Sequence, residues 1–229
     1  IVLISDELKK IMNFSTLEIQ KKIIVCHDGA IPNTSSVKVA KTVSNIGYFG
    51  SLYKGRGVES IIFKIANKFK NYNFYIVGGK KTDIEYFKKI GRNIKNLNFL
   101  GYKNQHELLE ISKKIDIFLA PYQDDTKIPS GSSSTNWMSP LKIFEYMSYG
   151  KPIISSNFKV LNEVLINNVN SILVKPNDIN EWINAILIMV NSKEVRKKLA
   201  SNALNDLNNK YTWSKRVEKI IIKFNEKKN

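Results

Sequence analysis

The chain has 229 residues, 43% of them hydrophobic and 24% charged, a composition typical of a globular protein and not of a disordered one. Its 36 Lys and Arg residues outnumber its 20 Asp and Glu residues and give a formal net charge of +16, which favours acidic partners such as phosphorylated small molecules, anionic lipid or nucleic acid. The single cysteine, Cys26, excludes a disulfide framework and a cysteine-based metal site, and no run reaches the roughly 18 apolar residues of a membrane-spanning helix.

Residues 1–35 read as one small structural unit followed by a linker. Two strand-like runs, IVLIS and KKIIVCHDG, flank the helix-like DELKKIM, and the turn-rich AIPNTSS follows them. This order predicts a single strand–helix–strand unit. We expect it to be the end of an N-terminal domain whose earlier part lies outside this sequence.

From about residue 45 onward, strand-like and helix-like segments alternate. The expected buried strands are IGYFGSL, NFYIVGG, LNFLGY, IDIFLAPY, KPIISS and SILVKP. Helical patterns lie at 58–70, 83–94, 105–115, 140–149, 161–165, 179–190 and 193–208. Alternation of this kind predicts an α/β fold with a Rossmann-like, doubly wound parallel sheet, whose ligands bind at the carboxyl ends of the strands.

In the segment YFGSLYKGRGVES, residues 48–60, a predicted strand runs into a glycine-rich turn and then a helix. The turn carries Lys54 and Arg56. Glycines let the backbone approach an anion, and a guanidinium group can bind phosphate with two parallel hydrogen bonds. Two interpretations remain open at this point: a phosphate-binding loop, or a tight turn with solvated cations.

Two further loops follow strands in the same way. Gly78 and Gly79 end the run YIVGG, and Tyr102 ends the run LNFLGY. The glycines indicate either close approach to a ligand or turn geometry alone, and Tyr102 either meets a base or sugar or lies at the edge of the core. Because the carboxyl ends of parallel strands share one rim, these loops together favour a phosphorylated ligand.

The stretch SSSTNWMSPLKIFEYMSYGKPIISS predicts a helix that begins abruptly after a Ser-rich loop. Ser139 suits the N-cap and Pro140 the first helical position, whereas Gly150 suits the residue after the helix. We expect the helix to span 140–149.

The two faces of this predicted helix differ. Leu141, Phe144 and Met147 are spaced as one buried stripe, whereas Lys142 and Glu145 share another face. A helix start carries unpaired N–H groups and partial positive charge, which bind phosphate. The alternative is an ordinary surface Lys–Glu pair.

The last segment, YTWSKRVEKIIIKFNEKK, predicts an amphipathic helix over 212–228 with Val217, Ile220, Ile221 and Phe224 on one side. Most of the stability of such a helix comes from packing its apolar face. We therefore expect residues 1–35 and 212–228 to contact each other.

The order and spacing of several motifs resemble one known family. The motifs are GYFGSLYKGRGVESII, FYIVGG, LNFLGY, IDIFLAPY, SPLKIFEYMSYGKPIISS and NEVL. They are similar to the C-terminal domain of GT-B glycosyltransferases of family 4, the group 1 retaining sugar transferases. The resemblance implies a donor-binding domain at 45–210, an acceptor domain ending within 1–35, and a C-terminal helix at 211–229 that crosses back to the acceptor domain.

The resemblance also implies roles for individual residues. Glu145 matches the ribose-contacting glutamate of the family's paired-glutamate motif, and Trp137 stands where the first glutamate is usual. Lys142 occupies the motif as in an SPLK subgroup. Arg56 matches the phosphate-binding cation, and Lys54 is expected to share its role.

The implied catalytic residues are Glu145, Arg56 and Lys142. The other expected donor contacts are Gly50, Ser51, Lys54, Gly78, Gly79, Tyr102, Met138, Ser139 and Leu141. Catalysis of this kind is largely electrostatic, because the diphosphate must be stabilised as it leaves while an acceptor hydroxyl attacks. The resemblance implies no metal and no cofactor besides the nucleotide-diphosphate sugar.

The implied function is the donor-binding half of a retaining, hexosyltransferase-like enzyme that acts on a saccharide or lipid-linked saccharide in cell-surface polysaccharide or glycoconjugate synthesis. The stretch alone is expected to bind donor and to turn over little. The alternatives are a nucleotide-sugar-binding module without turnover and a sugar-nucleotide epimerase of the same fold. Nucleic-acid binding is disfavoured, because the sequence has no dense basic block or aromatic-interleaved motif. A cytoplasmic location is expected, with the basic charge favouring peripheral contact at the inner face of the membrane.

Overall fold

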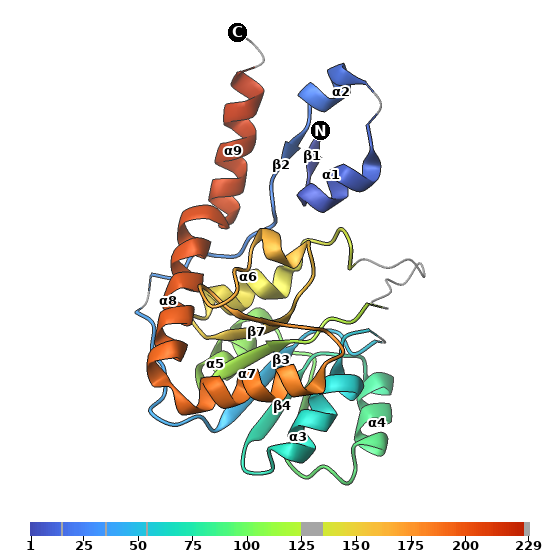
Figure 1. The fold of residues 1–229 in the computed structure, drawn as a ribbon, viewed down its shortest axis with the longest axis vertical. Coiled ribbons are helices and arrows are strands. Elements are labelled where there is room, and N and C mark those ends of the chain that lie inside the picture. The colour runs from blue at the N-terminus through green and yellow to red at the C-terminus, as the bar shows by residue number, and fades with distance from the viewer. Residues whose placement is uncertain (15, 35, 54, 125–134, 227–229) are drawn as a thin grey trace.

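The computed structural model describes residues 1–229 apart from 15, 35, 54, 125–134 and 227–229. Figure 1 shows a large α/β unit, a much smaller N-terminal unit, and a final helix that runs beside the N-terminal unit. The predicted fold class is confirmed.

The N-terminal unit is built on two very short parallel strands. Strand β1 (Val2–Leu3) pairs with β2 (Ile24–Val25), and helices α1 (Asp6–Met12) and α2 (Leu17–Lys21) connect them. The strand–helix–strand order was predicted, whereas α2 was not. Thr16 caps this extra helix, since its side chain accepts a hydrogen bond from the N–H of Ile19.

The large unit contains a six-stranded parallel sheet in the order β5-β4-β3-β6-β7-β8. Its strands are β3 (Asn45–Phe49), β4 (Asn73–Val77), β5 (Leu97–Gly101), β6 (Ile117–Ala120), β7 (Ile153–Ser156) and β8 (Ile172–Val174). The chain builds outward from β3 in one direction and then from β6 in the other. The β3–β6 junction is therefore the switch point at which ligands bind in sheets of this kind.

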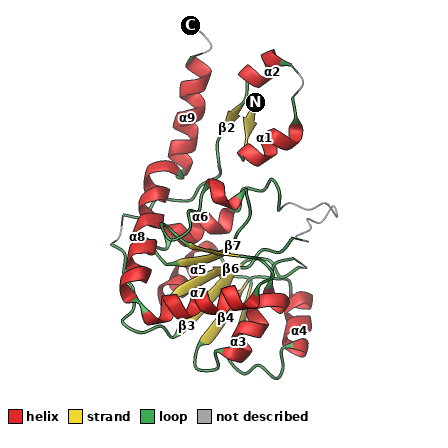
Figure 2. Ribbon diagram, viewed as in Figure 1, coloured by secondary structure: helices red, strands yellow, loops and turns green. Residues whose placement is uncertain are grey.

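Helices cover both faces of this sheet (Figure 2). In chain order they are the π-helix η1 (Val58–Phe63), α3 (Lys64–Lys68), α4 (Lys81–Ile90), α5 (Gln105–Lys114), α6 (Leu141–Ser148), the 3-10 helix η2 (Leu161–Glu163), α7 (Ile179–Asn191) and α8 (Lys193–Lys210). The last helix, α9 (Trp213–Asn225), lies away from the sheet (Figure 1). One apolar cluster joins the sheet to η1, α3 and α7, and a second joins it to α5, α6 and α8. Because both faces are covered, every residue of β6 is buried.

The start of α6 differs from its prediction. Pro140, not Ser139, occupies the N-cap, and no side chain caps the helix. The Ser139 hydroxyl instead accepts a hydrogen bond from the N–H of Asp28, at 3.0 Å. The first turn of α6 is thus left without a side-chain cap because its predicted cap is bonded to the N-terminal unit.

The predicted buried stripe of α6 was also partly wrong. Leu141 is 49% exposed, and the buried residues are Ile143, Phe144, Tyr146 and Met147. Helix α6 packs against both the sheet and α8, so its buried face is broader than one stripe and includes Ile143 and Tyr146. Leu141, in the first turn, lies outside that covered face.

Helix α9 contacts the N-terminal unit, as predicted. Ala30 and Thr212 form an isolated parallel bridge, the Arg216 guanidinium donates to the carbonyl of Cys26, and the ammonium of Lys219 donates to the carbonyl of Val25 at 2.9 Å. The contacts are made by the basic side of the helix. The apolar residues Val217, Ile221 and Phe224, which were expected to need a partner, are exposed among the described residues.

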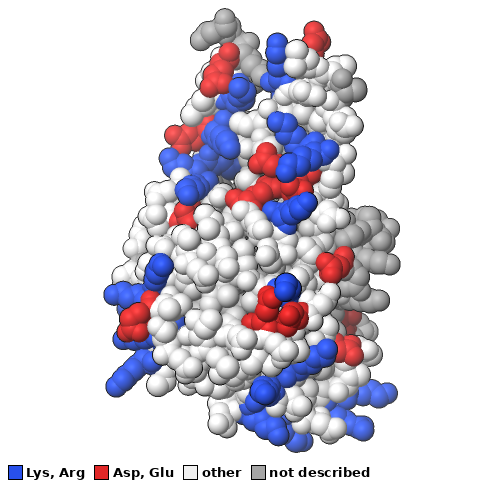
Figure 3. All heavy atoms as spheres, in the orientation of Figure 1, with Lys and Arg blue, Asp and Glu red and all other residues white. Residues whose placement is uncertain are grey.

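Two properties of the whole chain bear on its partners. Among the described residues, no helix is long and apolar enough to cross a membrane. On the face drawn in Figure 3, Lys and Arg lie mainly toward the two ends of the molecule, and uncharged residues predominate between them. The positive charge of this face is therefore not gathered into one patch.

Candidate functional site

The loop after β3 and the start of α6 meet at the carboxyl end of the central strands. Gly50 follows β3 and its N–H donates to the carbonyl of Val77 at 2.8 Å. Its φ is +154°, and a Cβ built there would lie 2.7 Å from Nζ of Lys142. The space that a side chain at position 50 would need is therefore filled by the ammonium group of Lys142.

Lys142 is held by aromatic rings. Its Nζ lies 4.2 Å from the ring centroid of Tyr48 and 4.9 Å from that of Tyr122, and it donates to the Tyr48 hydroxyl at 3.2 Å. That hydroxyl donates in turn to the carbonyl of Ser51, at 2.6 Å. Burial, with a contribution from the nearby charge of Arg56, holds the pKa of Lys142 well below its usual range.

Arg56 lies beside the same aromatic group. Its Cζ is 4.5 Å from the ring centroid of Tyr53 and 5.3 Å from that of Tyr122, and its guanidinium donates to the Tyr53 hydroxyl. Its Nε is buried and has no hydrogen-bond partner in the part of the chain that the structure describes. Burial raises the pKa of Tyr122, so its ring faces both cations in the neutral form.

Glu145 lies one turn after Lys142 on α6. Its carboxyl group is partly buried, and burial raises its pKa, while the charge of Lys142 acts in the opposite direction. No described residue donates a hydrogen bond to this carboxylate. Both oxygens are therefore available as acceptors for donor groups such as sugar hydroxyls.

Tyr146 fixes α6 to the end of β3. Its hydroxyl accepts from the N–H of Phe49 at 2.8 Å and donates to the carbonyl of Phe49 at 3.1 Å. Its ring stacks on Phe118 with the centroids 4.1 Å apart. This pairing sets the distance between the loop that carries Arg56 and the helix that carries Lys142 and Glu145.

Four tyrosines of the site, Tyr48, Tyr53, Tyr122 and Tyr146, were not among the predicted site residues. The sequence carries a positional signal for two of them, because Tyr48 and Tyr122 each belong to a predicted strand that runs into a loop with a cation.

Comparison with known proteins adds the family. The family model for glycosyl transferases group 1 matches residues 43–192. The chain belongs to the group 1 glycosyltransferases. It is 28% identical over 207 residues to an uncharacterized glycosyltransferase of Methanocaldococcus jannaschii, covering 88% of this chain and 49% of that protein. It is 32% identical over 151 residues to the UDP-Gal:alpha-D-GlcNAc-diphosphoundecaprenol alpha-1,3-galactosyltransferase of Escherichia coli, covering 64% of this chain and 35% of that protein.

Solved structures share the fold of this group 1 chain. The crystal structure of HepE of Anabaena in complex with UDP has a TM-score of 0.77 at 17% identity, over 98% of this chain and 63% of that one. A glycosyltransferase of Rickettsia africae has a TM-score of 0.75 at 15% identity, over 98% of this chain and 62% of that one. The chain spans about half the length, or less, of the curated relatives described here.

Gly78 and Gly79 lie against the loop after β3. Their φ values are +110° and +81°, and a Cβ on them would lie 2.3 Å from the carbonyl oxygen of Gly50 and 2.5 Å from the side chain of Leu52. In this group 1 domain, the two glycines allow the loops after β3 and β4 to pack together. Close approach to another loop therefore explains them without a ligand.

The remaining expected contacts are spread along the same edge of the sheet. Tyr102 is 81% exposed at the end of β5, so it does not belong to the edge of the core. Met138 is buried, and Ser51 is exposed. Lys54 and the middle of the loop before α6, residues 125–134, lie outside the described residues.

A hollow of about 1050 Å³ borders the loop after β3. Its lining includes Arg56, Tyr53, Tyr86 and Gln123, but neither Lys142 nor Glu145. The hollow therefore overlaps the candidate site at Arg56 and at its partner Tyr53. The candidate site is therefore defined by the positions of Arg56, Lys142 and Glu145, and not by the shape of this cavity.

Proposed function

We propose that the chain is the donor-binding half of a retaining glycosyltransferase that moves a hexose from a nucleotide-diphosphate sugar to a hydroxyl acceptor. One observation carries the proposal. Arg56 and Lys142 lie beside one ring, Tyr122, and neither has a carboxylate within salt-bridge distance among the described residues. Aromatic faces hold cations without neutralising them, so both groups are available to an anion with two phosphate groups, which also favours the protonated form of Lys142.

The chemistry of sugar transfer fits this arrangement. When the bond between sugar and diphosphate breaks, negative charge develops on the diphosphate, and cations already in place stabilise it. The guanidinium of Arg56 suits a phosphate because it offers several N–H donors in one plane. The uncapped first turn of α6 adds N–H groups and the positive end of a helix dipole. Glu145 accepts hydrogen bonds from the ribose hydroxyls.

The relatives support the choice of donor and acceptor class. HepE binds UDP in its crystal structure, and the relative from Escherichia coli is named for transfer from UDP-Gal to a diphosphoundecaprenol-linked sugar. We accordingly propose a UDP-sugar as the first donor to test. A lipid-linked saccharide is the proposed acceptor, at the inner face of the cell membrane and in cell-surface polysaccharide synthesis.

We also propose a division of the chain into domains. Residues 45–210 form the donor-binding domain, residues 1–35 end the acceptor domain, and residues 211–229 cross back to it. The hydrogen bonds of Arg216 to Cys26 and of Lys219 to Val25 support this division, because they join the last helix to the N-terminal unit.

A calorimetric screen tests the proposal. UDP, GDP, ADP and their glucose derivatives are titrated into the 229-residue chain, and sugar release is followed in parallel. We expect saturable binding of one nucleoside diphosphate family and slow or no turnover. Binding of none of these nucleotides, or displacement of the bound nucleotide by DNA at moderate salt, would exclude a donor site.

A further inference from the structure

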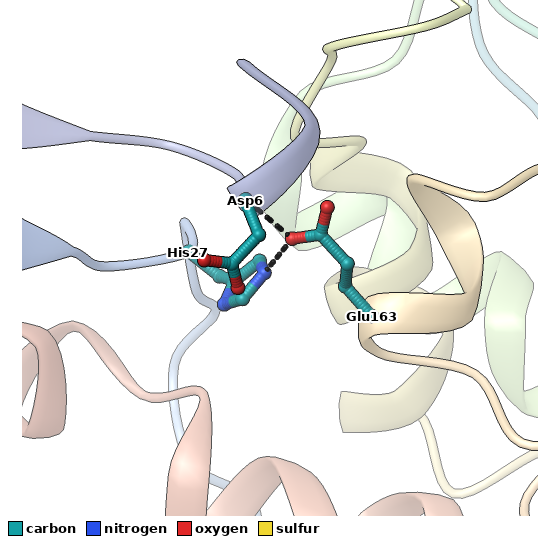
Figure 4. Close-up of side chains that lie close together, drawn as sticks. All are labelled: Asp6, His27 and Glu163. Carbon is teal, nitrogen blue, oxygen red and sulfur yellow. Dashed lines mark hydrogen bonds and ion pairs between the residues drawn. The ribbon is translucent and has the colours of Figure 1, made fainter. Parts of the chain in front are cut away.

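Glu163, in the 3-10 helix after β7, joins the large unit to the N-terminal unit. Its carboxylate accepts the N–H of Asp6 at 2.8 Å and the N–H of Glu7 at 2.9 Å, both in the first turn of α1. Its Oε2 also lies 2.7 Å from Nε2 of His27, just after β2 (Figure 4). One side chain, only 12% exposed, therefore binds both segments of the N-terminal unit that face the large unit.

Two further hydrogen bonds connect the same segments to the loop before α6. The hydroxyl of Ser5, which is fully buried, donates to the carbonyl of Trp137 at 2.8 Å. The N–H of Asp28 donates to the hydroxyl of Ser139 at 3.0 Å. Ser5 and Asp28 are the chain neighbours of Asp6 and His27, the two residues that Glu163 holds.

The loop at 137–139 leads directly into the helix that carries Lys142 and Glu145. Ser5 and Asp28 of the N-terminal unit fix the position of this loop through their hydrogen bonds. Ser139, the last residue of the loop, does not cap α6. A loop that is held by two hydrogen bonds from another unit will shift if that unit moves. A shift of about 1 Å in a site is enough to lower activity strongly.

We infer that Glu163 is a positioning residue for the donor site. It fixes the N-terminal unit so that Ser5 and Asp28 hold the loop at 137–139, and through this loop it sets the start of α6. The inference rests on the proposed function, because it concerns the binding of the same nucleotide-diphosphate donor. Glu163 does not touch the donor itself.

A metal ion is the other role that this cluster offers. Asp6, His27 and Glu163 place one ligand atom each within 4.8 Å of one another. Both carboxylate oxygens of Glu163 already accept backbone N–H groups, and Oε2 is also bonded to His27. A metal would have to displace these hydrogen bonds, so the geometry favours the positioning role.

The test measures UDP affinity by calorimetry in the full 229-residue chain. Glu163→Gln replaces one acceptor oxygen by an NH₂ group, which faces an N–H and cannot bond to it. We expect UDP to bind about tenfold more weakly to this variant. Glu181→Gln is the matched control, because Glu181 also accepts a backbone N–H, from Lys175, and forms an ion pair, but within the described ranges it has no hydrogen bond or ion pair with the N-terminal unit.

A double-mutant cycle separates positioning from a general loss of stability. Ser5→Ala removes the hydrogen bond to Trp137, together with the cap that this hydroxyl gives the N–H of Leu8 in α1, and should weaken UDP binding about threefold. If Glu163 acts through Ser5, the double variant binds UDP no more weakly than Glu163→Gln alone, because the effects of coupled residues do not add. Ser5→Ala also keeps the inference testable should Glu163→Gln fail to fold, since unchanged UDP affinity in this variant overturns it.

The remaining outcomes are distinguishable. Multiplied losses in the double variant, or an unchanged affinity in Glu163→Gln while the parent chain binds UDP, overturn the inference and leave the proposed function standing. UDP affinity that falls with EDTA and returns with Zn²⁺ overturns it in favour of a metal site. If the parent chain binds no nucleoside diphosphate, the proposed function fails and the inference with it.

Discussion

Arg56 and Lys142 lie against aromatic rings, and among the described residues no carboxylate forms an ion pair with either of them. Tyr122 lies within 5.3 Å of Arg56 and 4.9 Å of Lys142, measured to its ring centroid. Two cations near one ring repel each other, and this repulsion contributes to the lowered pKa of Lys142. An anion that binds between them offsets this repulsion, so the arrangement suits a doubly charged ligand.

Arg56 should discriminate between nucleotides and nucleosides. Arg56→Ala removes a charge-assisted contact to phosphate, so it should weaken UDP binding by about 1.5–3 kcal/mol and leave uridine binding nearly unchanged. Calorimetry with both ligands measures the difference, and Arg92→Ala, at an exposed arginine on another loop, is the control. Equal losses for UDP and uridine would instead show that the loop had collapsed.

Glu145 should act on the nucleoside part. Glu145→Ala should weaken the binding of UDP and uridine alike, by about 1–3 kcal/mol, because it removes hydrogen bonds to a charged acceptor. The variant should not be less stable, since burial raises the pKa of this carboxyl and its ionised form is unfavourable in the folded chain. Titration and thermal unfolding measure the two effects. Unchanged affinity for every nucleotide would refute the ribose role.

Lys142 should take up a proton when the diphosphate binds. Burial and the charge of Arg56 hold the pKa of Lys142 well below its usual range, and a bound anion raises this pKa, so affinity should fall as pH rises through the lowered value. Above about pH 7.5 the phosphate groups, with a second pKa near 6, no longer contribute. Calorimetry in buffers of different ionisation enthalpy counts the protons. Lys142→Met should abolish the uptake, and uptake that persists in this variant would point to another group.

At the scale of the helices and strands, periodicity predicted what depends on local sequence. The six strands of the large sheet were placed within a few residues, and the capping box of α5 is present, with Asn104 and Glu107 each accepting the other's N–H at 2.9 Å. Features that depend on contacts between distant residues were not predicted. Ser139 does not cap α6, because its hydroxyl accepts a hydrogen bond from Asp28, which is 111 residues away in sequence. The tyrosines around Arg56 and Lys142 come together only when β3 and β6 pair.

Arg196 connects two elements that no sequence pattern joins. Its buried guanidinium donates to the carbonyls of Met189 and Val190 at the end of α7, and to those of Ala40 and Lys41 in the linker before β3. A helix end that is buried needs such donors for its unpaired carbonyl groups.

Replacing this residue should therefore destabilise the fold. Arg196→Met should lower the free energy of unfolding by about 3 kcal/mol, because several buried carbonyls lose their donor. Arg196→Lys should recover only part of the loss, since an ammonium group cannot span both segments. Urea denaturation measures both, with Arg92→Met as the control. A loss below about 1 kcal/mol would mean that water replaces the guanidinium.

At the scale of the whole molecule, hydrogen bonds connect the candidate donor site to the N-terminal unit. Glu163, Ser5 and Asp28 link the unit to the loop before α6, and Arg216 links it to α9. Helix α9 keeps an exposed apolar face, with a groove lined by Trp213 and Ile221 among others. The candidate donor site therefore lies in the large unit, and residues of the N-terminal unit hold the loop that leads into it.

The most direct test of this account is one calorimetric comparison of UDP with uridine, in the parent chain and in the double variant Arg56→Ala/Lys142→Met. If Arg56 and Lys142 bind the diphosphate, the parent chain should bind UDP at least tenfold more tightly than uridine, corresponding to about 1.4 kcal/mol. The double variant should lose this preference. A parent chain without preference for the diphosphate, or a double variant that retains it, would contradict the assignment of these two cations to a diphosphate site.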